Sequence, residues 1–159
     1  MAFDSITVRL VEQADLAALH AREPQPDARL AQSHLDRQDA GSYFFAVAVD
    51  ASNTPLGLGA IDCRPGRLCP ELRDLLVYPE ARGHGVATQI SQYLESLAAR
   101  AGFSEVFLRV DPENETAIPV FIGLDYTPTG DHLPALAAGG SLPDAERLDA
   151  VYRKSLRIA

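Results

Sequence analysis

Alternation of apolar and polar positions defines the first strands that the sequence predicts. Ile6–Leu10 alternates over a short run, and Tyr43–Val49 is rich in aromatic and β-branched residues. A cluster of turn residues, Asp50–Pro55, follows, and Leu56–Cys63 returns, so the two longer runs are predicted to form a hairpin. Further strands are predicted over Leu72–Val77, over Val106–Val110, from Tyr126 onward and over Leu148–Leu156.

Helical spacing of apolar residues predicts the remaining elements. The clearest case is Val86–Ala101, where apolar residues recur at i, i+4, i+7 and i+8 and Gly102 follows as a stop. Two short helices are predicted before the first long strand. The second carries His34 on its apolar face, where we interpret it as a face residue rather than a ligand.

The last predicted helix lies between Asn114 and Gly123. Pro119 inside it would remove a backbone donor, which favours a start near Ile118 with the proline in the first turn. A long loop is predicted over Gly130–Arg147. The order of elements indicates one mixed α/β layered domain over residues 1–159.

Composition limits the classes of function. The chain has 159 residues, 47% of them apolar, and a net charge of −8. Because no cluster of Lys and Arg appears, we expect no nucleic-acid partner. Cys63 and Cys69 lack zinc-ligand spacing, so no metal is predicted. Since neither a signal-peptide pattern nor a long apolar run is present, we expect a cytoplasmic protein that does not bind membranes.

The candidate chemistry lies where a strand breaks into a glycine turn. The strand is predicted to end at Val77, and Gly83 and Gly85 precede the long helix. Glycines let successive backbone N–H groups turn inward, and the positive end of a helix dipole lies beside them. Arg82 adds a positive charge and Thr88 a hydroxyl group. The stretch therefore indicates phosphate binding, although an ordinary turn into a helix can also hold two glycines.

The motifs resemble one family over nearly the whole chain. Arg82–Ala87 matches the R/Q-x-x-G-x-G/A loop of the GNAT superfamily of N-acetyltransferases, and Leu76–Glu80 resembles the strand end that precedes it. Val110–Ala117 is similar to the second element of the family that contacts the cofactor. Phe121–Tyr126 resembles its Y-x-x-x-G-F motif, and Asp149–Lys154 its last strand.

This resemblance implies a fold, a cofactor and a binding site. The fold would be a mixed, mostly antiparallel sheet with a splayed parallel strand pair at its centre and helices on both faces. The cofactor would be acetyl-CoA, its pyrophosphate on the glycine turn and its pantetheine arm in the gap of the splayed pair. The implied cofactor-binding residues are Leu76, Val77, Arg82, Gly83, His84, Gly85, Val86, Ala87, Thr88, Asn114 and Phe121.

The catalytic residues are less well marked. Transfer to an amine needs a neutral nitrogen, so a base is required, and Glu71 at the start of its strand is the candidate. The tyrosine that commonly protonates the leaving thiolate in the family is replaced by Phe121. Water, Tyr78, Tyr126 or His84 are the alternatives, with Tyr78 the residue we select. If neither water nor one of these side chains supplies the proton, the remaining alternative is a protein that binds acetyl-CoA without efficient turnover.

The predicted function is acetyl transfer from acetyl-CoA to a primary amine of a small molecule, in a ternary complex. Two alternatives stay open. One is an acetyl-CoA sensor with little or no catalysis, which Phe121 in place of the usual tyrosine leaves open. The other is acetylation of a protein N-terminus or lysine. A homodimer is compatible with the family resemblance, and no residue pattern selects it.

Overall fold

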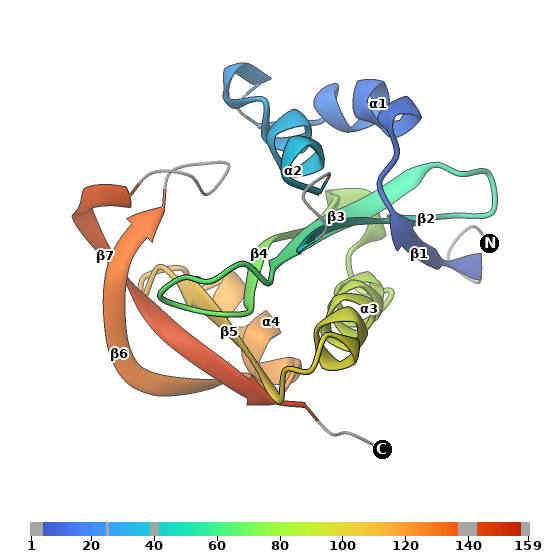
Figure 1. The fold of residues 1–159 in the computed structure, drawn as a ribbon. Helices are drawn as coiled ribbons and strands as arrows, with labels where there is room; N and C mark the ends of the chain where they lie inside the picture. The colour runs from blue at the N-terminus through green and yellow to red at the C-terminus, as the bar shows by residue number, and fades with distance from the viewer. Residues whose placement is uncertain (1–4, 25, 39–41, 137–142, 157–159) are drawn as a thin grey trace.

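The computed structural model describes residues 5–24, 26–38, 42–136 and 143–156. Its centre is one seven-stranded sheet with the order β1-β2-β3-β4-β5-β7-β6 (Figure 1). Because β4 and β5 are parallel and every other neighbouring pair is antiparallel, the predicted sheet is confirmed. The strands are β1 (Thr7–Leu10), β2 (Tyr43–Val49), β3 (Pro55–Asp62), β4 (Glu71–Val77), β5 (Glu105–Val110), β6 (Thr127–Leu136) and β7 (Pro143–Ser155).

Helices cover both faces of this sheet, as expected. In Figure 1, α1 and α2 lie above it, and α3 and α4 lie below it. One apolar core joins Leu19 and Leu35 of the upper helices to Phe45 of β2, and another packs Ile90 and Leu94 of α3 under the sheet. The bounds are α1 (Leu16–His20), α2 (Leu30–Gln38), α3 (Val86–Arg100) and α4 (Ala117–Gly123).

The parallel pair is splayed. One position joins the two strands, with Glu71 of β4 opposite Phe107 of β5, and Phe107 N–H donates to the Pro70 carbonyl over 3.0 Å. On its other side β4 carries a bulge, because the register against β3 shifts between Leu58 and Ala60. Asp74 within that bulge has a left-handed backbone with φ of 52°. The strand therefore turns away from β5 toward its C-terminal end.

Two details of the predicted elements are settled by the structure. Helix α4 begins at Ala117, so Pro119 lies in its first turn, where its missing N–H costs little. Asp125, at the position where the family motif has glycine, adopts φ of 74°, a conformation that Asp tolerates better than most residues.

The predicted loop over Gly130–Arg147 is wrong at both ends. Strand β6 continues to Leu136 and β7 starts at Pro143, so the two form a long antiparallel hairpin. Pro128 and Pro134 are tolerated on β6 because this strand is the edge of the sheet and needs hydrogen bonds on one side only. The Gly139-Gly140 pair lies outside the described residues.

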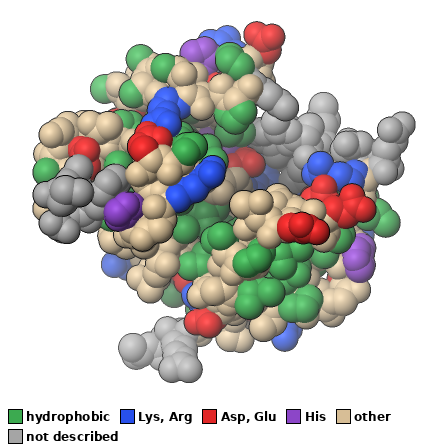
Figure 2. Space-filling model, turned by 180° about the vertical axis from the view of Figure 1, so that it is seen from behind, with side chains coloured by type: hydrophobic (Ala, Val, Ile, Leu, Met, Phe, Trp, Pro, Cys, Tyr) green, Lys and Arg blue, Asp and Glu red, His purple; other side chains and the backbone are tan. Residues whose placement is uncertain are grey.

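Among the described residues, no helix is both long and apolar enough to cross a membrane. The most exposed large apolar side chains are those of Val120, Ile122 and Leu148. Figure 2 shows apolar side chains gathered on the face seen from behind, with acidic side chains beside them.

Candidate active site

Two hollows open where β4 and β5 separate. The first, which we call the cofactor hollow, has a volume of about 410 Å³ and lies between the end of β4, the glycine turn and α4. The second, the acceptor hollow, has about 340 Å³ and lies between β4, β5 and the start of β7. Leu75, Ala117 and Phe121 line both. The two hollows therefore meet at these three side chains.

Most of the predicted cofactor residues come together in the cofactor hollow. Gly83 and Gly85 have φ of 81° and 78°, and a Cβ at either would meet no atom within 4 Å. The turn is thus left-handed and open on the side where a ligand would approach. The predicted residues that line this hollow are Leu76, Val77, Arg82, Gly83, Gly85, Val86, Ala87, Thr88 and Phe121.

The N-terminus of α3 supplies unpaired donors to the same place. Gly85 is the N-cap residue of α3. Among the described residues, no side chain accepts a capping hydrogen bond from the first-turn N–H groups of the helix. The first backbone bond into the helix is Gln89 N–H to Gly85 O, at 3.1 Å. The N–H groups of the first turn therefore remain for a ligand, with the helix dipole behind them.

These residues fit the pyrophosphate and pantetheine of acetyl-CoA. The open glycine turn and the first-turn N–H groups suit an anion, and a nearby guanidinium adds positive charge. That guanidinium, Arg82, donates from Nε to the Val77 carbonyl over 3.3 Å, so it lies along the end of β4. Val120 of α4, 44% exposed, gives the hollow an apolar wall. When bound, acetyl-CoA would supply an activated acetyl group as a thioester.

Two of the predicted cofactor residues, His84 and Asn114, do not line the cofactor hollow. His84 is exposed within the turn and does not line the cofactor hollow. Asn114 lines the acceptor hollow, and its Oδ1 accepts from Ala117 N–H over 3.0 Å at the start of α4. Their roles in holding the cofactor stay predictions that this placement does not favour.

Tyr78 is buried on the opposite side of the sheet from α3. It belongs to the core under α1 and α2, and the Arg22 guanidinium lies 3.9 Å from its ring centre. Burial raises the pKa of its phenol, and the positive charge of Arg22 offsets part of this rise. Because Tyr78 lines neither hollow, the geometry gives no support to its predicted role as the acid.

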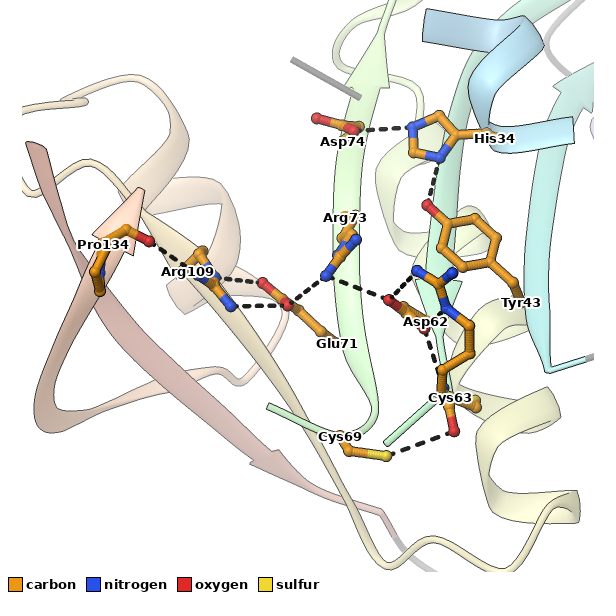
Figure 3. Close-up of polar contacts among 11 residues, drawn as sticks. His34, Tyr43, Asp62, Cys63, Cys69, Glu71, Arg73, Asp74, Arg109 and Pro134 are labelled. Atoms are coloured by element: carbon orange, nitrogen blue, oxygen red, sulfur yellow. Dashed lines mark hydrogen bonds and ion pairs between the residues drawn. The ribbon is translucent and has the colours of Figure 1, made fainter. Parts of the chain in front are cut away.

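Glu71 lies in the acceptor hollow, but not as a solvated carboxylate. It is 1% exposed. Arg109 Nε donates to its Oε2 over 2.7 Å, and Arg73 Nη2 lies 3.2 Å from its Oε1 (Figure 3). Arg109 also donates to the Pro134 carbonyl, and Arg73 contacts Asp62. Glu71 is therefore the centre of a chain of ion pairs that joins β3, β4 and β5 and that a hydrogen bond from Arg109 extends to β6.

A second carboxylate in this hollow lacks such partners. Asp149 of β7 is 4% exposed and lines the acceptor hollow. Its Oδ1 has no hydrogen-bond partner among the described residues. The Nε of Arg147 lies 3.3 Å from that oxygen, at ion-pair distance but without hydrogen-bond alignment. A buried carboxylate oxygen without a donor favours a ligand that brings one.

A third carboxylate, Asp74, connects the acceptor hollow to the core. Its Oδ2 lies 2.8 Å from Nε2 of His34, whose Nδ1 is hydrogen-bonded to the Tyr43 hydroxyl (Figure 3). His34 is 0% exposed, whereas the side chain of Asp74 is 36% exposed. Burial raises the pKa of Tyr43, so its hydroxyl stays protonated near neutral pH.

Sequence reasoning missed most of the acceptor hollow. Its charged side chains come from strands that are distant in the chain, and no short motif joins them. One signal was visible: His34 is a polar residue on an apolar helix face, which implies a buried partner. Within the described residues, no group of three or more His, Cys, Asp or Glu side chains is arranged to hold a metal ion.

Comparison with solved structures shows the fold. An N-acetyltransferase from Staphylococcus aureus Mu50 is 23% identical, with a TM-score of 0.70 and coverage of 96% of this chain and 99% of that one. A spermidine N-acetyltransferase from Vibrio cholerae, solved with CoA and spermine, is 18% identical, with a TM-score of 0.69 and 96% coverage of each chain. The structure of yncA from Salmonella typhimurium with its cofactor acetyl-CoA is 21% identical, with a TM-score of 0.68 and coverage of 96% and 95%.

Comparison of the sequence with family models identifies the family. No curated protein matches this sequence. The family model for the acetyltransferase (GNAT) family matches residues 9–124, which is well over half of the chain and contains the glycine turn and both sides of the splayed pair. The chain therefore belongs to the GNAT acetyltransferase family.

Proposed function

We propose that this protein transfers an acetyl group from acetyl-CoA to a primary amine of a small, cationic molecule. The observation that carries the proposal is the meeting of the two hollows at Leu75, Ala117 and Phe121. One hollow has the donors that a pyrophosphate needs, and the other holds carboxylates. A thioester at the junction would lie within reach of an amine in the acceptor hollow.

The charges in the acceptor hollow support a cationic acceptor. Arg109 is paired with Glu71, and Arg73 is paired with both Glu71 and Asp62, so both guanidinium groups are already engaged by carboxylates. Asp149 keeps a buried oxygen without a hydrogen bond, and the partner of Asp74 is an imidazole. A second positive charge on the acceptor would therefore find a carboxylate. The volume of about 340 Å³ suits a small molecule better than a protein segment.

In this proposal Glu71 is not the base that the sequence indicated but a residue that positions two arginines. Both of its carboxylate oxygens already accept hydrogen bonds from Arg109. Taking a proton would weaken those bonds and leave two buried guanidinium groups without a full counter-charge. We therefore assign Glu71 the task of holding Arg73 and Arg109 in place.

The proton for the leaving thiolate is proposed to come from water or from the attacking nitrogen. Phe121 at the junction has no proton to give, and Tyr78 lies outside both hollows. Phe121 instead lines the place where the thioester would lie and keeps it apolar. Transition-state stabilisation would then rest mainly on positioning of the two substrates.

A panel of primary amines tests the proposal. Thiol release from acetyl-CoA is measured with three acceptors of equal chain length, whose far ends carry an ammonium, a methyl or a carboxylate group. Spermidine is included, because one neighbour in fold was solved with spermine. We expect the ammonium compound to be the best, by about tenfold over the methyl compound, which corresponds to ~1.4 kcal/mol. Equal rates for all three would contradict a cationic acceptor.

Asp149→Asn is the matched variant for this panel. It should reduce the preference for the ammonium compound, because the negative charge of a buried carboxylate whose Oδ1 accepts no hydrogen bond is removed. Asp131→Asn serves as the control, since Asp131 is exposed on β6 and lines neither hollow. An unchanged preference in Asp149→Asn would remove Asp149 from the acceptor site.

A further inference from the structure

We propose that Asp74 is the base that takes the proton from the acceptor ammonium, and that buried His34 is its positioning residue. The proposal rests on the proposed function, since it assigns a residue within the same acceptor hollow. The three titratable side chains involved are Asp74 of β4, His34 of α2 and Tyr43 of β2, which hydrogen bonds join in a row. Sequence reasoning had given none of them a function.

Hydrogen-bond chemistry fixes the direction of this chain. An ionised carboxylate only accepts, so Nε2 of His34 carries the proton that bonds Asp74. Nδ1 of the neutral imidazole is then an acceptor, and the Tyr43 hydroxyl donates to it. His34 packs against Phe45 with ring centres 4.9 Å apart. The imidazole is thus fixed by hydrogen bonds at both nitrogens and by an aromatic contact.

The position of Asp74 points to function rather than to stability alone. Its backbone is left-handed, with φ of 52°, a conformation that is strained for a non-glycine residue. The bulge of β4 turns its side chain toward α2 and into the acceptor hollow. His34 engages Oδ2, so Oδ1 is the oxygen that an amine would meet.

The other charged groups around Asp74 are largely matched in pairs. Glu71 engages Arg73 on the same strand and Arg109 of β5. On β7, Asp149 lies beside Arg147. Arg37 of α2 lies over the ring of Tyr43, and Asp111, directly after β5, accepts from the Glu113 backbone N–H. Among the carboxylates of the hollow, Asp74 alone has an imidazole as its side-chain partner within the described residues.

The proton balance of the step is simple. Oδ1 of Asp74 accepts one proton from the ammonium, which frees the lone pair of the nitrogen. That nitrogen forms a C–N bond with the acetyl carbonyl carbon, and the C–S bond breaks with its electron pair on sulfur. The second proton of the nitrogen goes to the thiolate, and Asp74 returns its proton to water. His34 remains neutral and keeps the carboxylate aimed at the amine.

The pH profile of Asp74→Asn tests the base. Asn tolerates the left-handed backbone and can still accept from His34, so the fold is preserved. With the best amine of the panel, the wild type should show nearly constant kcat/KM between about pH 6 and 9, because Asp74 removes the proton. The variant should be slower by about 10²–10⁴ at neutral pH. Its kcat/KM should then rise about tenfold per pH unit toward the pKa of the free amine, near ~10.4.

Two measurements separate this proposal from the proposed function. Calorimetric titration with acetyl-CoA should give the same Kd for the wild type and Asp74→Asn, because Asp74 does not line the cofactor hollow. Imidazole ¹⁵N shifts in the free protein should show His34 as the Nε2–H tautomer. A wild type that acetylates no amine overturns both proposals. An active wild type with a deficit in Asp74→Asn that is equal at every pH overturns the base alone.

His34 is tested with two variants that differ in one donor. His34→Gln keeps an N–H that can reach Asp74, and His34→Leu fills similar space without it. We expect His34→Gln to retain about tenfold more kcat/KM than His34→Leu, with both keeping the flat pH profile of the wild type. Equal rates would show that His34 does not position Asp74. Asp36→Asn, an exposed change on the same helix, should leave the profile unchanged.

Discussion

Gly83 and Gly85 hold the turn before α3 in a left-handed conformation and leave its outer side free of side chains. Both features matter for a phosphate, which must approach the backbone N–H groups closely. This part of the site could be predicted from the sequence, because all its components lie within a few residues of one another.

Gly85→Val should therefore abolish tight binding of acetyl-CoA. The new side chain would occupy the open side of the turn and remove one or two charge-assisted hydrogen bonds, each of about 1.5–3 kcal/mol. We expect Kd to rise by at least about tenfold in calorimetry. Gly102→Val is the matched control, since Gly102 at the end of α3 has φ of 100° and equally open space. If both variants bind alike, the pyrophosphate is not held at Gly85.

Phe121 is one of the three residues at which the two hollows meet, and its ring is only partly buried. Phe121→Ala should weaken acetyl-CoA binding by about tenfold, because ~1–2 kcal/mol of apolar contact with the ligand is lost. Ile122→Ala is the control on the same helix, since Ile122 is 55% exposed and lines neither hollow. Equal affinities for both variants and the wild type would place the thioester elsewhere.

At the scale of elements, ion pairs hold the splayed strands in their positions. Asp62 at the end of β3 accepts from Arg64 over 2.9 Å and lies 3.2 Å from Arg73, which also contacts Glu71 of β4 (Figure 3). Burial raises the pKa of Asp62, but the hydrogen bonds from Arg64 and the charge of Arg73 outweigh it, and the net shift is downward. The carboxylate therefore contributes stability above the pKa of the unfolded chain and loses it as the pH falls through the folded pKa.

Asp62→Asn should reduce the free energy of unfolding by about 1–3 kcal/mol at pH 7. The difference from the wild type should shrink as the pH falls below ~4, the unfolded pKa of an aspartate, because the wild type then loses the same charge. Urea denaturation of both proteins from pH 7 to pH 3 measures this difference in the free energy of unfolding. A difference that stays constant with pH would mean that the ion pairs of Asp62 do not contribute to stability.

Most elements could be predicted from local periodicity, since Tyr43–Val49 and Val86–Arg100 follow clear strand and helix patterns. The β6–β7 hairpin could not, because its prolines indicate a loop unless the strand is known to lie at an edge. The contact of His34 with Asp74 joins positions 40 residues apart, so it depends on how α2 packs over β4. Asp149 likewise enters the site only through the pairing of β5 with β7.

For the whole molecule, the splay of β4 and β5 is the feature that creates function. A continuous parallel pair would satisfy the backbone of β4 and close both hollows. Here the strands share one paired position and separate beyond it, which leaves room for the cofactor hollow and the acceptor hollow. Membership of the GNAT family and this geometry together support acetyl transfer rather than cofactor binding alone.

The most direct test of this account is a calorimetric titration with acetyl-CoA, run beside a free-thiol assay with the cationic amines of the panel. We predict a Kd on the order of micromolar and one thiol released for each acetylated amine found by mass spectrometry. Binding without thiol release from any amine would contradict the enzymatic account and favour an acetyl-CoA sensor. Absence of binding would contradict the cofactor site itself.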